Sequence, residues 1–490
     1  MMIRFDNSYA RLPERFYARV SPTPVQNPRV VKVNRGLAEL LGLDAEFLES
    51  PAGAQLLAGN VVPDGAEPIA QAYAGHQFGS FVPRLGDGRA ILLGEVLGGD
   101  ERRRDIQLKG AGRTPFSRRG DGRAALGPVL REYIVSEAMT ALGIPATRAL
   151  AAVTTGEPVI RDGLLPGGVL TRVAASHIRI GTFQFFANLG DREALRQLTT
   201  YALERHYPDA SGTGNDALAL LERVSAAQAS LVARWLGVGF VHGVMNTDNM
   251  SISGETIDFG PCAFLDEYDP KKTFSSIDHG GRYAFANQPR IALWNLARLA
   301  ETLLPQIADD TEQAIRLATQ HLDRFEAEFE RAYLDVMRPK LGLLQADEND
   351  AALIEGLLAQ LAEHAIDYTL FFRRLVAAAE PSGASGVLSL FGGKEAAIHG
   401  WLEVWRRRLA LEPDRAASRV PAMERANPAL IPRNHRVEEA IQAAVSHADF
   451  EPFETLVQAL ATPHAARPEH AHLAEPPRPE ERVTQTFCGT

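Results

Sequence analysis

Cysteine is scarce in this sequence, since Cys262 and Cys488 are the only two among 490 residues. Two thiols are too few for the disulfide framework that stabilises many secreted domains, so the composition favours a reducing compartment. One thiol follows the stretch Asp258-Phe259-Gly260-Pro261, and the other lies near the end of the chain. Spacing alone leaves open whether the two thiols are unrelated or form a redox link between the tail and that stretch.

Long apolar runs and an excess of basic residues are also missing. No stretch approaches the roughly 20 apolar residues that span a bilayer, and the start, MMIRFDNSYARLPERFYARV, lacks the apolar core of a signal peptide. The formal net charge is -10, whereas nucleic-acid and membrane-surface binders are usually basic. We therefore expect a bacterial cytoplasmic protein that binds neither nucleic acid nor membrane. The sequence does not indicate an oligomeric state.

Several well-known catalytic signatures are absent as well. The sequence contains no G-x-G-x-x-G, no Walker A motif and no G-x-S-x-G. Glycines do occur in LGDGRA, which holds Gly86 and Gly88, and in KGAGR. Glycine lets the backbone approach a phosphate closely, so both stretches are weak candidates for a phosphate-binding loop.

The chain is long enough for a folded body of two or more lobes, because 45% of its residues are hydrophobic and 23% are charged. Strand patterns dominate the early part and helical patterns the later part. We expect an α+β protein, with an N-terminal extension and β-rich lobe over residues 1–170. We expect next a helical lobe over residues 171–340. The last part, over 341–490, would be a helical C-terminal extension with a cysteine-containing tail.

A strand and the helix after it carry one charged residue each. In RDIQLKGAG, alternation places Ile106 and Leu108 on one face and Lys109 on the other. The next segment, GPVLREYIVSEAMTALGIP, predicts a helix with a proline near its start and a glycine just past its end. Glu132 lies off the apolar stripe of that helix. A strand lysine followed by a helix glutamate is the arrangement with which protein kinases hold nucleotide phosphates.

The stretch HGVMNTDNMSISGETIDFG, residues 242–260, resembles the catalytic end of a protein kinase. Kinases have H-R-D-x-x-x-x-N followed by D-F-G, and here His242, Asn249 and Asp258 keep these positions. Val244 replaces the catalytic aspartate. We expect a short hairpin, 250–252 against 256–257, which brings Asn249 and Asp258 to one edge.

Asn249 and Asp258 offer an amide oxygen and a carboxylate, which are hard ligands suited to Mg²⁺, with Mn²⁺ as an alternative ion. Two protein ligands leave room for water and phosphate oxygens, as in a metal–nucleotide site. Arginine is plentiful nearby, and most of it suits a solvated surface. Arg172 and Arg179 lie among small and apolar neighbours, and they are either solvated surface charges or guanidinium groups that bind phosphate oxygens bidentately.

Five segments closely resemble the selenoprotein O family, and the resemblance runs through nearly the whole chain. They are AYAGHQFGSFVPRLGDGRAILLGE, DIQLKGAGRTPFSRRGDGRAALGPVLREY, GVLTRVAASHIRIGTFQFF, GFVHGVMNTDNMSISGETIDFGPCAFLDEYDP and the terminal CGT. The resemblance implies a two-lobed protein-kinase-like fold. It also implies transfer of AMP from ATP to Ser, Thr or Tyr hydroxyls of proteins, with release of pyrophosphate. The ATP of that family is flipped relative to kinases.

The resemblance also implies roles for particular residues. Lys109 would hold the distal phosphates and pair with Glu132, while Arg172 and Arg179 would bind the γ-phosphate. Asn249 and Asp258 would bind Mg²⁺, and Asp248 would accept the proton of the acceptor hydroxyl. The remaining residues expected to line the nucleotide are Gly86, Gly88, Arg89, Asp121 and Gly122.

Two other functions stay open at this stage. An ordinary kinase would transfer the γ-phosphoryl group, although Val244 argues against it, and a non-catalytic scaffold would bind ATP without forming a product. The resemblance further implies regulation through a disulfide from the C-terminal cysteine to the activation segment. In this chain Cys262 is the only internal partner for Cys488, and we expect oxidation to lower activity.

Overall fold

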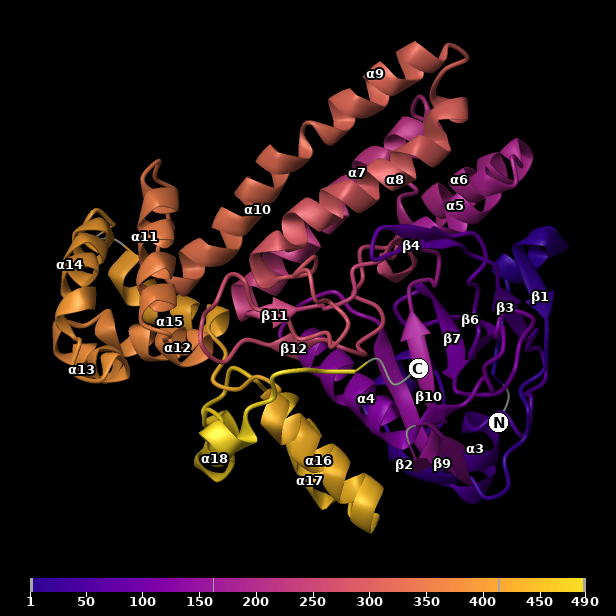
Figure 1. Ribbon diagram of the computed structural model, residues 1–490, viewed down its shortest axis with the longest axis horizontal. Coiled ribbons are helices and arrows are strands. Elements are labelled where there is room, and N and C mark those ends of the chain that lie inside the picture. The colour runs from indigo at the N-terminus through magenta and orange to yellow at the C-terminus, as the bar shows by residue number, and fades with distance from the viewer. Residues whose placement is uncertain (1–2, 162, 413–414, 488–490) are drawn as a thin grey trace.

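The computed structural model describes residues 3–487 apart from 162, 413 and 414, and it leaves out the side chains of 381, 382 and 416. The protein is a mixed α+β structure, as the sequence indicates. Figure 1 shows the sheet in indigo and purple at one end of the molecule. The orange helices α11–α15 lie at the opposite end, and long helices connect the two.

The strands form one antiparallel sheet and two short pairs. The sheet has the order β1-β3-β6-β7-β10-β9-β2, with β8 paired to β10, while β4 pairs with β5 and β11 with β12. Their bounds are β1 Tyr17–Arg19, β2 Arg29–Val33, β3 Ile69–Gln71, β4 Gly75–Gln77, β5 Ser80–Val82, β6 Ala90–Leu97, β7 Arg103–Lys109, β8 Ala124–Ala125, β9 Arg148–Ile160, β10 Leu164–Ala174, β11 Phe240–Val241 and β12 Ala263–Phe264. The N-terminal extension therefore supplies both edge strands, β1 and β2.

The helices fall into three groups along the chain. Those that flank the sheet are α1 Arg35–Leu40, α2 Ala45–Glu49, α3 Pro51–Leu57 and α4 Leu126–Ala141. The middle group is α5 Ile180–Asn188, α6 Arg192–His206, α7 Asp216–Val238, α8 Gln288–Ile307, α9 Thr311–Leu322 and α10 Phe325–Lys340. The last group is α11 Asp350–Glu363, α12 Tyr368–Ala378, α13 Ser385–Leu388, α14 Ala396–Ala410, α15 Ala416–Ala426, α16 Asn434–His447, α17 Glu451–Leu460 and α18 Ala471–Ala474.

Both faces of the sheet are covered. On one face, Ile106 and Leu108 of β7 join a buried cluster with residues of α1, α2 and α3. On the other face, Leu130 and Ile134 of α4 pack with residues of α16 and α17, such as Phe453. Figure 1 accordingly shows the yellow pair α16 and α17 beside α4. Helices from the end of the chain thus complete the core beneath the first sheet.

Local sequence signals explain the two elements that carry Lys109 and Glu132. The strand predicted from RDIQLKGAG is β7, whose Lys109 pairs in register with Ala90 of β6 and Leu170 of β10. The predicted helix is α4, with Pro128 in its first turn and Gly143 just past its end at a φ of 77°. Glycine adopts this left-handed conformation at little cost, so it ends the helix.

The hairpin expected at 250–257 is shorter than predicted. Met250 and Thr256 form an isolated antiparallel bridge. Among the described residues 250–257, this bridge does not extend into a strand ladder. The turn is nevertheless tight, because Gly254 has a φ of 75°. Other bonds take the place of the ladder: the Ile180 amide donates to the Met250 carbonyl, and the Thr256 amide donates to the Pro145 carbonyl.

The predicted division into three parts remains a prediction, and β10 runs across residue 170. Near the end of the chain, Thr486 is buried and pairs with Ser275 in a parallel bridge. Its hydroxyl donates to the carbonyl of Pro261 at 2.5 Å. None of the helices within the described residues is long and apolar enough to span a membrane.

Candidate active site

Lys109, Glu132, Arg172 and Asp258 form one cluster at the junction of β7, α4, β10 and the loop after Ile257. The Lys109 Nζ lies 2.6 Å from Oε2 of Glu132 and 2.9 Å from Oδ1 of Asp258. Arg172 donates through Nε to Oε1 of Glu132 at 2.7 Å and through a terminal nitrogen to Asp258 at 2.7 Å. Two cations therefore hold two carboxylates, and the pairing of Lys109 with Glu132 expected from the sequence is present.

Both carboxylates of this cluster are ionised. Burial alone would raise the pKa of Glu132, but the charges of Arg172 and Lys109 outweigh burial and lower it. The same competition holds the pKa of Asp258 well below its ordinary value, since Lys109, Arg172 and Arg179 face it. Asp258 also has a left-handed backbone with a φ of 65°. A non-glycine residue in this conformation is strained, and such strain is common at functional sites.

Arg179 adds a third cation from the residue immediately before α5. Its terminal nitrogen donates to the backbone carbonyl of Asp248 at 2.9 Å and lies 3.8 Å from Oδ2 of Asp258. Its guanidinium group stacks over the ring of Tyr73, 4.3 Å from the centroid. Because the side chain is buried and held on both sides, its charge has a fixed position.

Asp248 lies in a short turn of 3-10 helix, Thr247–Asn249, and its side chain is buried. Gln77 donates to Oδ2 at 3.3 Å, whereas Oδ1 has no hydrogen-bond donor among the described residues. Burial raises the pKa of Asp248 to about 6, although Arg179 opposes the rise. A carboxylate with a raised pKa and one unpartnered oxygen is chemically suited to accept a proton.

The β4–β5 hairpin covers the turn that carries Asp248, and its role at the site is a feature that sequence patterns did not predict. The amide of His76 donates to Oγ1 of Thr247 at 2.7 Å, and the amide of Phe78 donates to Oδ1 of Asn246 at 3.0 Å. With the Gln77 bond, three consecutive hairpin residues contact three consecutive loop residues. The signal lay in GHQFGS, whose turn glycine indicates a hairpin, but its partner is distant in sequence.

Asn249 and Asp258 both face the same cavity, as a shared metal site requires. Asn249 donates its amide NH₂ to the carbonyl of Val244 at 3.0 Å, which directs the amide oxygen away from Val244. His242 is buried and holds Asp258 indirectly, because its Nε2 lies 2.9 Å from the carbonyl of Ile257. An amide oxygen and an ionised carboxylate fit a magnesium ion that takes its other ligands from water and phosphate.

A cavity of about 750 Å³ joins these groups to the glycine-containing loops. Gly86 has a φ of 64°, and a Cβ there would lie 2.2 Å from the ring of Phe116. Gly122 has a φ of 71°, and a Cβ there would lie 2.1 Å from the carbonyl oxygen of Gly112. The cavity is lined by every residue predicted for the site except Glu132, namely Gly86, Gly88, Arg89, Lys109, Asp121, Gly122, Arg172, Arg179, Asp248, Asn249 and Asp258.

Asp121 lies outside the cluster of Lys109, Glu132, Arg172 and Asp258, and a different arginine holds its carboxylate. Arg161, just after β9, contacts both carboxylate oxygens, at 2.9 Å and 3.2 Å. Burial would raise the pKa of Asp121, but the bonds from Arg161 and from the Arg123 amide lower it. Asp121 thereby fixes the loop around Gly122 against the tip of the β9–β10 hairpin.

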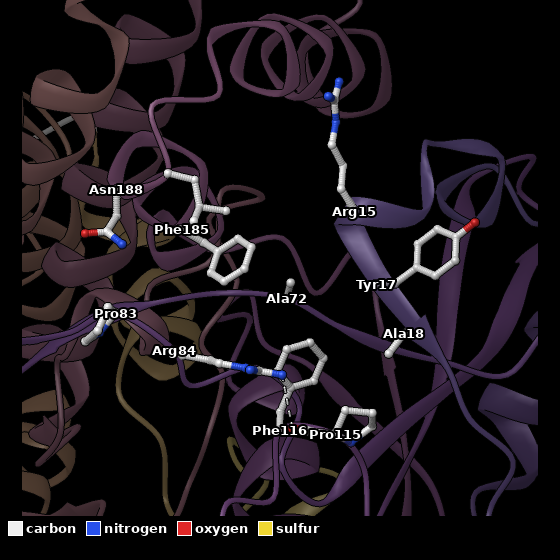
Figure 2. Close-up of a pocket in the computed structure, with 11 residues that line it drawn as sticks. Arg15, Tyr17, Ala18, Ala72, Pro83, Arg84, Pro115, Phe116, Phe185 and Asn188 are labelled. Atoms are coloured by element: carbon white, nitrogen blue, oxygen red, sulfur yellow. Dashed lines mark hydrogen bonds between the residues drawn. The ribbon is translucent and has the colours of Figure 1, made fainter.

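An apolar pocket of about 480 Å³ lies next to the main cavity, and Phe116 lines both. Figure 2 shows Phe185 and Phe116 pointing into this pocket, with Arg84 beside the Phe116 ring. Thr114 and Ser117 donate hydroxyl groups to the carbonyls of Asp87 and Gly88. The pocket therefore lies behind the loop of Gly86 and Gly88, and its wall supports that loop.

The cysteines predicted to interact are described only in part. Cys262 is buried, and its Sγ lies 3.2 Å from the carbonyl of Phe259. Cys488 lies outside the described residues. Thr486 docks on the carbonyl of Pro261, the residue before Cys262, so the described end of the tail reaches the segment that carries this thiol.

Fixed cations around a cavity that also holds hard oxygen ligands are typical of enzymes that handle nucleoside triphosphates. Comparison with known proteins specifies the class. The family model "Protein adenylyltransferase SelO" matches residues 1–461. The chain belongs to this family, which confirms the resemblance seen in the sequence, and it is a protein nucleotidyltransferase.

Individual relatives match over almost their whole length. The "Protein nucleotidyltransferase YdiU" of Rhizobium meliloti (strain 1021) is 61% identical over 487 residues, which cover 99% of each chain. The protein of the same name from Methylorubrum populi is 62% identical over 493 residues, and that from Bradyrhizobium diazoefficiens 61% over 486, again over 99% of each chain.

Proposed function

We propose that this protein transfers AMP from ATP to Ser, Thr or Tyr hydroxyls of protein substrates and releases pyrophosphate. In this proposal the fold is a two-lobed, protein-kinase-like fold with N-terminal and helical C-terminal extensions. The ATP is flipped relative to kinases, so that its polyphosphate lies deep in the cavity. The observation that carries the proposal is that backbone groups between β10 and α5 already have hydrogen-bond partners within the protein.

In the proposed kinase-like fold, this connecting segment would lie where a protein kinase binds adenine. Here its backbone groups already have partners: the Ala175 amide donates to Glu255 at 2.9 Å, and the Ala175 carbonyl accepts from Arg205 at 2.9 Å. The His177 amide donates to Asp105 at 2.9 Å, and the His177 carbonyl accepts from Arg179 at 3.1 Å. An adenine ring would have to break these bonds, which favours a different position for the base.

The charges near that segment favour the polyphosphate instead. Lys109, Arg172 and Arg179 converge on Asp258 from three elements, and guanidinium groups match phosphate oxygens bidentately. We assign Lys109 to the distal phosphates and Arg172 and Arg179 to the γ-phosphate. Gly86, Gly88, Arg89, Asp121 and Gly122 would then line the rest of the nucleotide.

Asp248 acts as the base in the proposed reaction. The acceptor oxygen forms a bond to the α-phosphorus, and the bond from that phosphorus to the oxygen bridging to the β-phosphorus breaks. Pyrophosphate leaves with the electron pair, and Asp248 takes the hydroxyl proton. Val244 stands at the kinase base position, so a base at Asp248 suits a nucleotide that presents a different phosphorus atom. Positioning and electrostatics supply most of the rate.

Asn249 and Asp258 would hold Mg²⁺, with Mn²⁺ as an alternative ion. The ion would supply charge neutralisation on the polyphosphate when bound. His242 and the strained backbone of Asp258 keep that carboxylate directed at the cavity. We further propose a bacterial cytoplasmic location, consistent with the sequence composition.

Label transfer tests the proposed function. The protein is incubated with Mg²⁺, reductant and a cell lysate, with ATP labelled at either the α- or the γ-phosphate. Protein labelled by α-³²P-ATP alone, and no longer labelled in Asp258→Ala, supports AMP transfer. Label from γ-³²P-ATP alone identifies a kinase and contradicts the flipped nucleotide. No label on the lysate or on the protein itself favours the non-catalytic scaffold.

A further inference from the structure

We propose that the β4–β5 hairpin and residues 274–285 together bind the acceptor segment of a protein substrate, and that Arg282 selects an acidic side chain near the acceptor hydroxyl. We call these two elements the acceptor surface. The inference rests on the proposed function, because it concerns the second substrate of the same site.

Both elements border the cavity that contains Asp248. Gln77 and Phe78 of the hairpin line this cavity, and Gln77 contacts Asp248 directly. On the other element, Ile277 lines the cavity although the residue is 60% exposed. A protein that presents a hydroxyl to Asp248 therefore meets the hairpin and residues 274–285 as it approaches.

Arg282 is held in place on this surface. Its guanidinium group lies 4.6 Å from the centroid of the Trp294 ring and 5.7 Å from that of Tyr283. Its backbone amide donates to Oδ1 of Asp278 at 2.8 Å. A Cβ built on Gly79 would lie 3.6 Å from its Cζ, so the guanidinium group rests against the turn of the hairpin. Stacking of this kind fixes the orientation of the guanidinium group and leaves its charge able to bind an anion.

The guanidinium group of Arg282 is in direct contact with aromatic rings and not with a carboxylate of the described residues. None of the ion pairs between described residues includes it, whereas neighbouring Arg298 pairs with Glu301 at 2.7 Å. Arg282 is partly exposed, so its terminal nitrogens can bind an external anion that approaches this surface.

The rest of the acceptor surface and its surroundings define the partner more closely. Phe81 on the hairpin is 39% exposed, so it and Ile277 offer apolar contact area. Arg118 and Arg119 line the cavity and are exposed, which adds positive charge around the cavity. The matching ligand is an extended protein segment whose hydroxyl residue has an acidic and an apolar side chain within a few positions.

A peptide library tests this inference. Each peptide carries one serine with three randomised positions on each side, and mass spectrometry identifies the peptides that gain AMP. The wild-type protein should label peptides with Asp or Glu at one or more of these positions about fivefold more than peptides with Lys or Arg there. Arg282→Glu should reverse the preference, and Arg282→Gln should abolish it. Both variants should keep the Kd for ATP, which shows that they are folded. Arg290→Glu, an exposed change in the same region, should keep the wild-type preference.

The outcomes separate this inference from the proposed function. If the wild-type protein labels peptides without regard to charge, or if Arg282→Glu keeps the acidic preference, the inference is wrong while AMP transfer stands. If the protein labels itself with α-³²P but labels no peptide, an acidic segment is not a sufficient acceptor, and the inference is again wrong. If no α-label is transferred to any protein or peptide, the proposed function itself fails.

Discussion

Gly75 packs directly against Asp248: a Cβ on Gly75 would lie 2.4 Å from Oδ1 of that carboxylate. The absence of a side chain at the start of β4 thus lets the hairpin approach the proposed base closely. Gly181 has a similar role in α5, because a Cβ there would lie 2.1 Å from the carbonyl oxygen of Ala74. The position of Asp248 depends on these two close approaches between distant parts of the chain.

Gly75→Ala should therefore impair catalysis more than nucleotide binding. The added methyl group displaces the Asp248 carboxylate, and a displacement of about 1 Å at a reacting group costs roughly a hundredfold in rate. We expect the rate of α-label transfer to fall at least tenfold, with the Kd for ATP within about twofold of wild type.

Gly400→Ala is the matched control, since a Cβ at that position in α14 meets no atom within 4 Å. It should leave the rate unchanged and slightly raise the thermal midpoint, because alanine favours a helix more than glycine. A Gly75→Ala protein with the wild-type transfer rate would show that the hairpin does not position Asp248.

The pairing of Glu132 with Lys109 and Arg172 predicts a stability effect distinct from catalysis. Glu132→Ala leaves the buried Arg172 guanidinium with Asp258 as its remaining carboxylate, so the free energy of unfolding should fall by about 3 kcal/mol. Urea unfolding measures this loss. Glu193→Ala removes an exposed pair with Arg196 and should cost less than about 1 kcal/mol. Equal effects of the two changes would contradict the buried network.

Short local patterns pointed to Lys109, Glu132, Asn249 and Asp258, whereas the roles of Arg172, Arg179 and Asp248 came from the family resemblance, and all these roles remain predictions. Strand alternation separated Lys109 from Leu108, and motif spacing located Asn249 and Asp258. These signals are local, so they can be recognised without knowledge of the fold. The length of the 250–257 hairpin was predicted less well, because bonds to Ile180 and Pro145 replace its ladder.

Sequence patterns did not predict the contacts between segments that are distant in the chain. Gln77 and Asp248 are 171 positions apart, and nothing in GHQFGS shows which loop the hairpin covers. The N-terminal strands β1 and β2 also join opposite edges of the sheet, although the sequence suggested only an N-terminal extension for this region. Partner choice in these cases depends on tertiary packing, which local periodicity does not encode.

The redox link between the two cysteines gives a third prediction. Thr486 docks on Pro261 and Phe274, so the described tail runs beside the segment of buried Cys262. Oxidation should join Cys262 to Cys488, tether the tail and lower label transfer. Because Cys262 is buried, the reaction should be slow without partial opening of that segment. Non-reducing mass spectrometry that never finds the linked peptide would refute the link. Cys262→Ser should make activity insensitive to oxidant.

Lys340 at the end of α10 predicts how stability depends on pH. Its side chain is buried, and its Nζ lies 4.3 Å from the ring centroid of Phe372. Burial lowers its pKa from 10.5 to about 7. Between these two values the unfolded chain binds more protons at this lysine than the folded protein does, so the contribution of Lys340 to stability rises with pH. The free energy of unfolding should rise by up to about 1.4 kcal/mol per pH unit. The rise should stop near the pKa of the lysine in the unfolded chain.

Lys340→Met removes this titration and keeps the length of the side chain. At pH 7 the variant should be more stable than the wild-type protein, because no charge is buried. Its advantage should shrink by about 1 kcal/mol per pH unit as the pH rises to 9. Urea unfolding at pH 7, 8 and 9 measures the difference, with Lys394→Met as the control at an exposed position. A difference that stays constant with pH would mean that Lys340 remains protonated in the folded protein, held by the aromatic rings beside it.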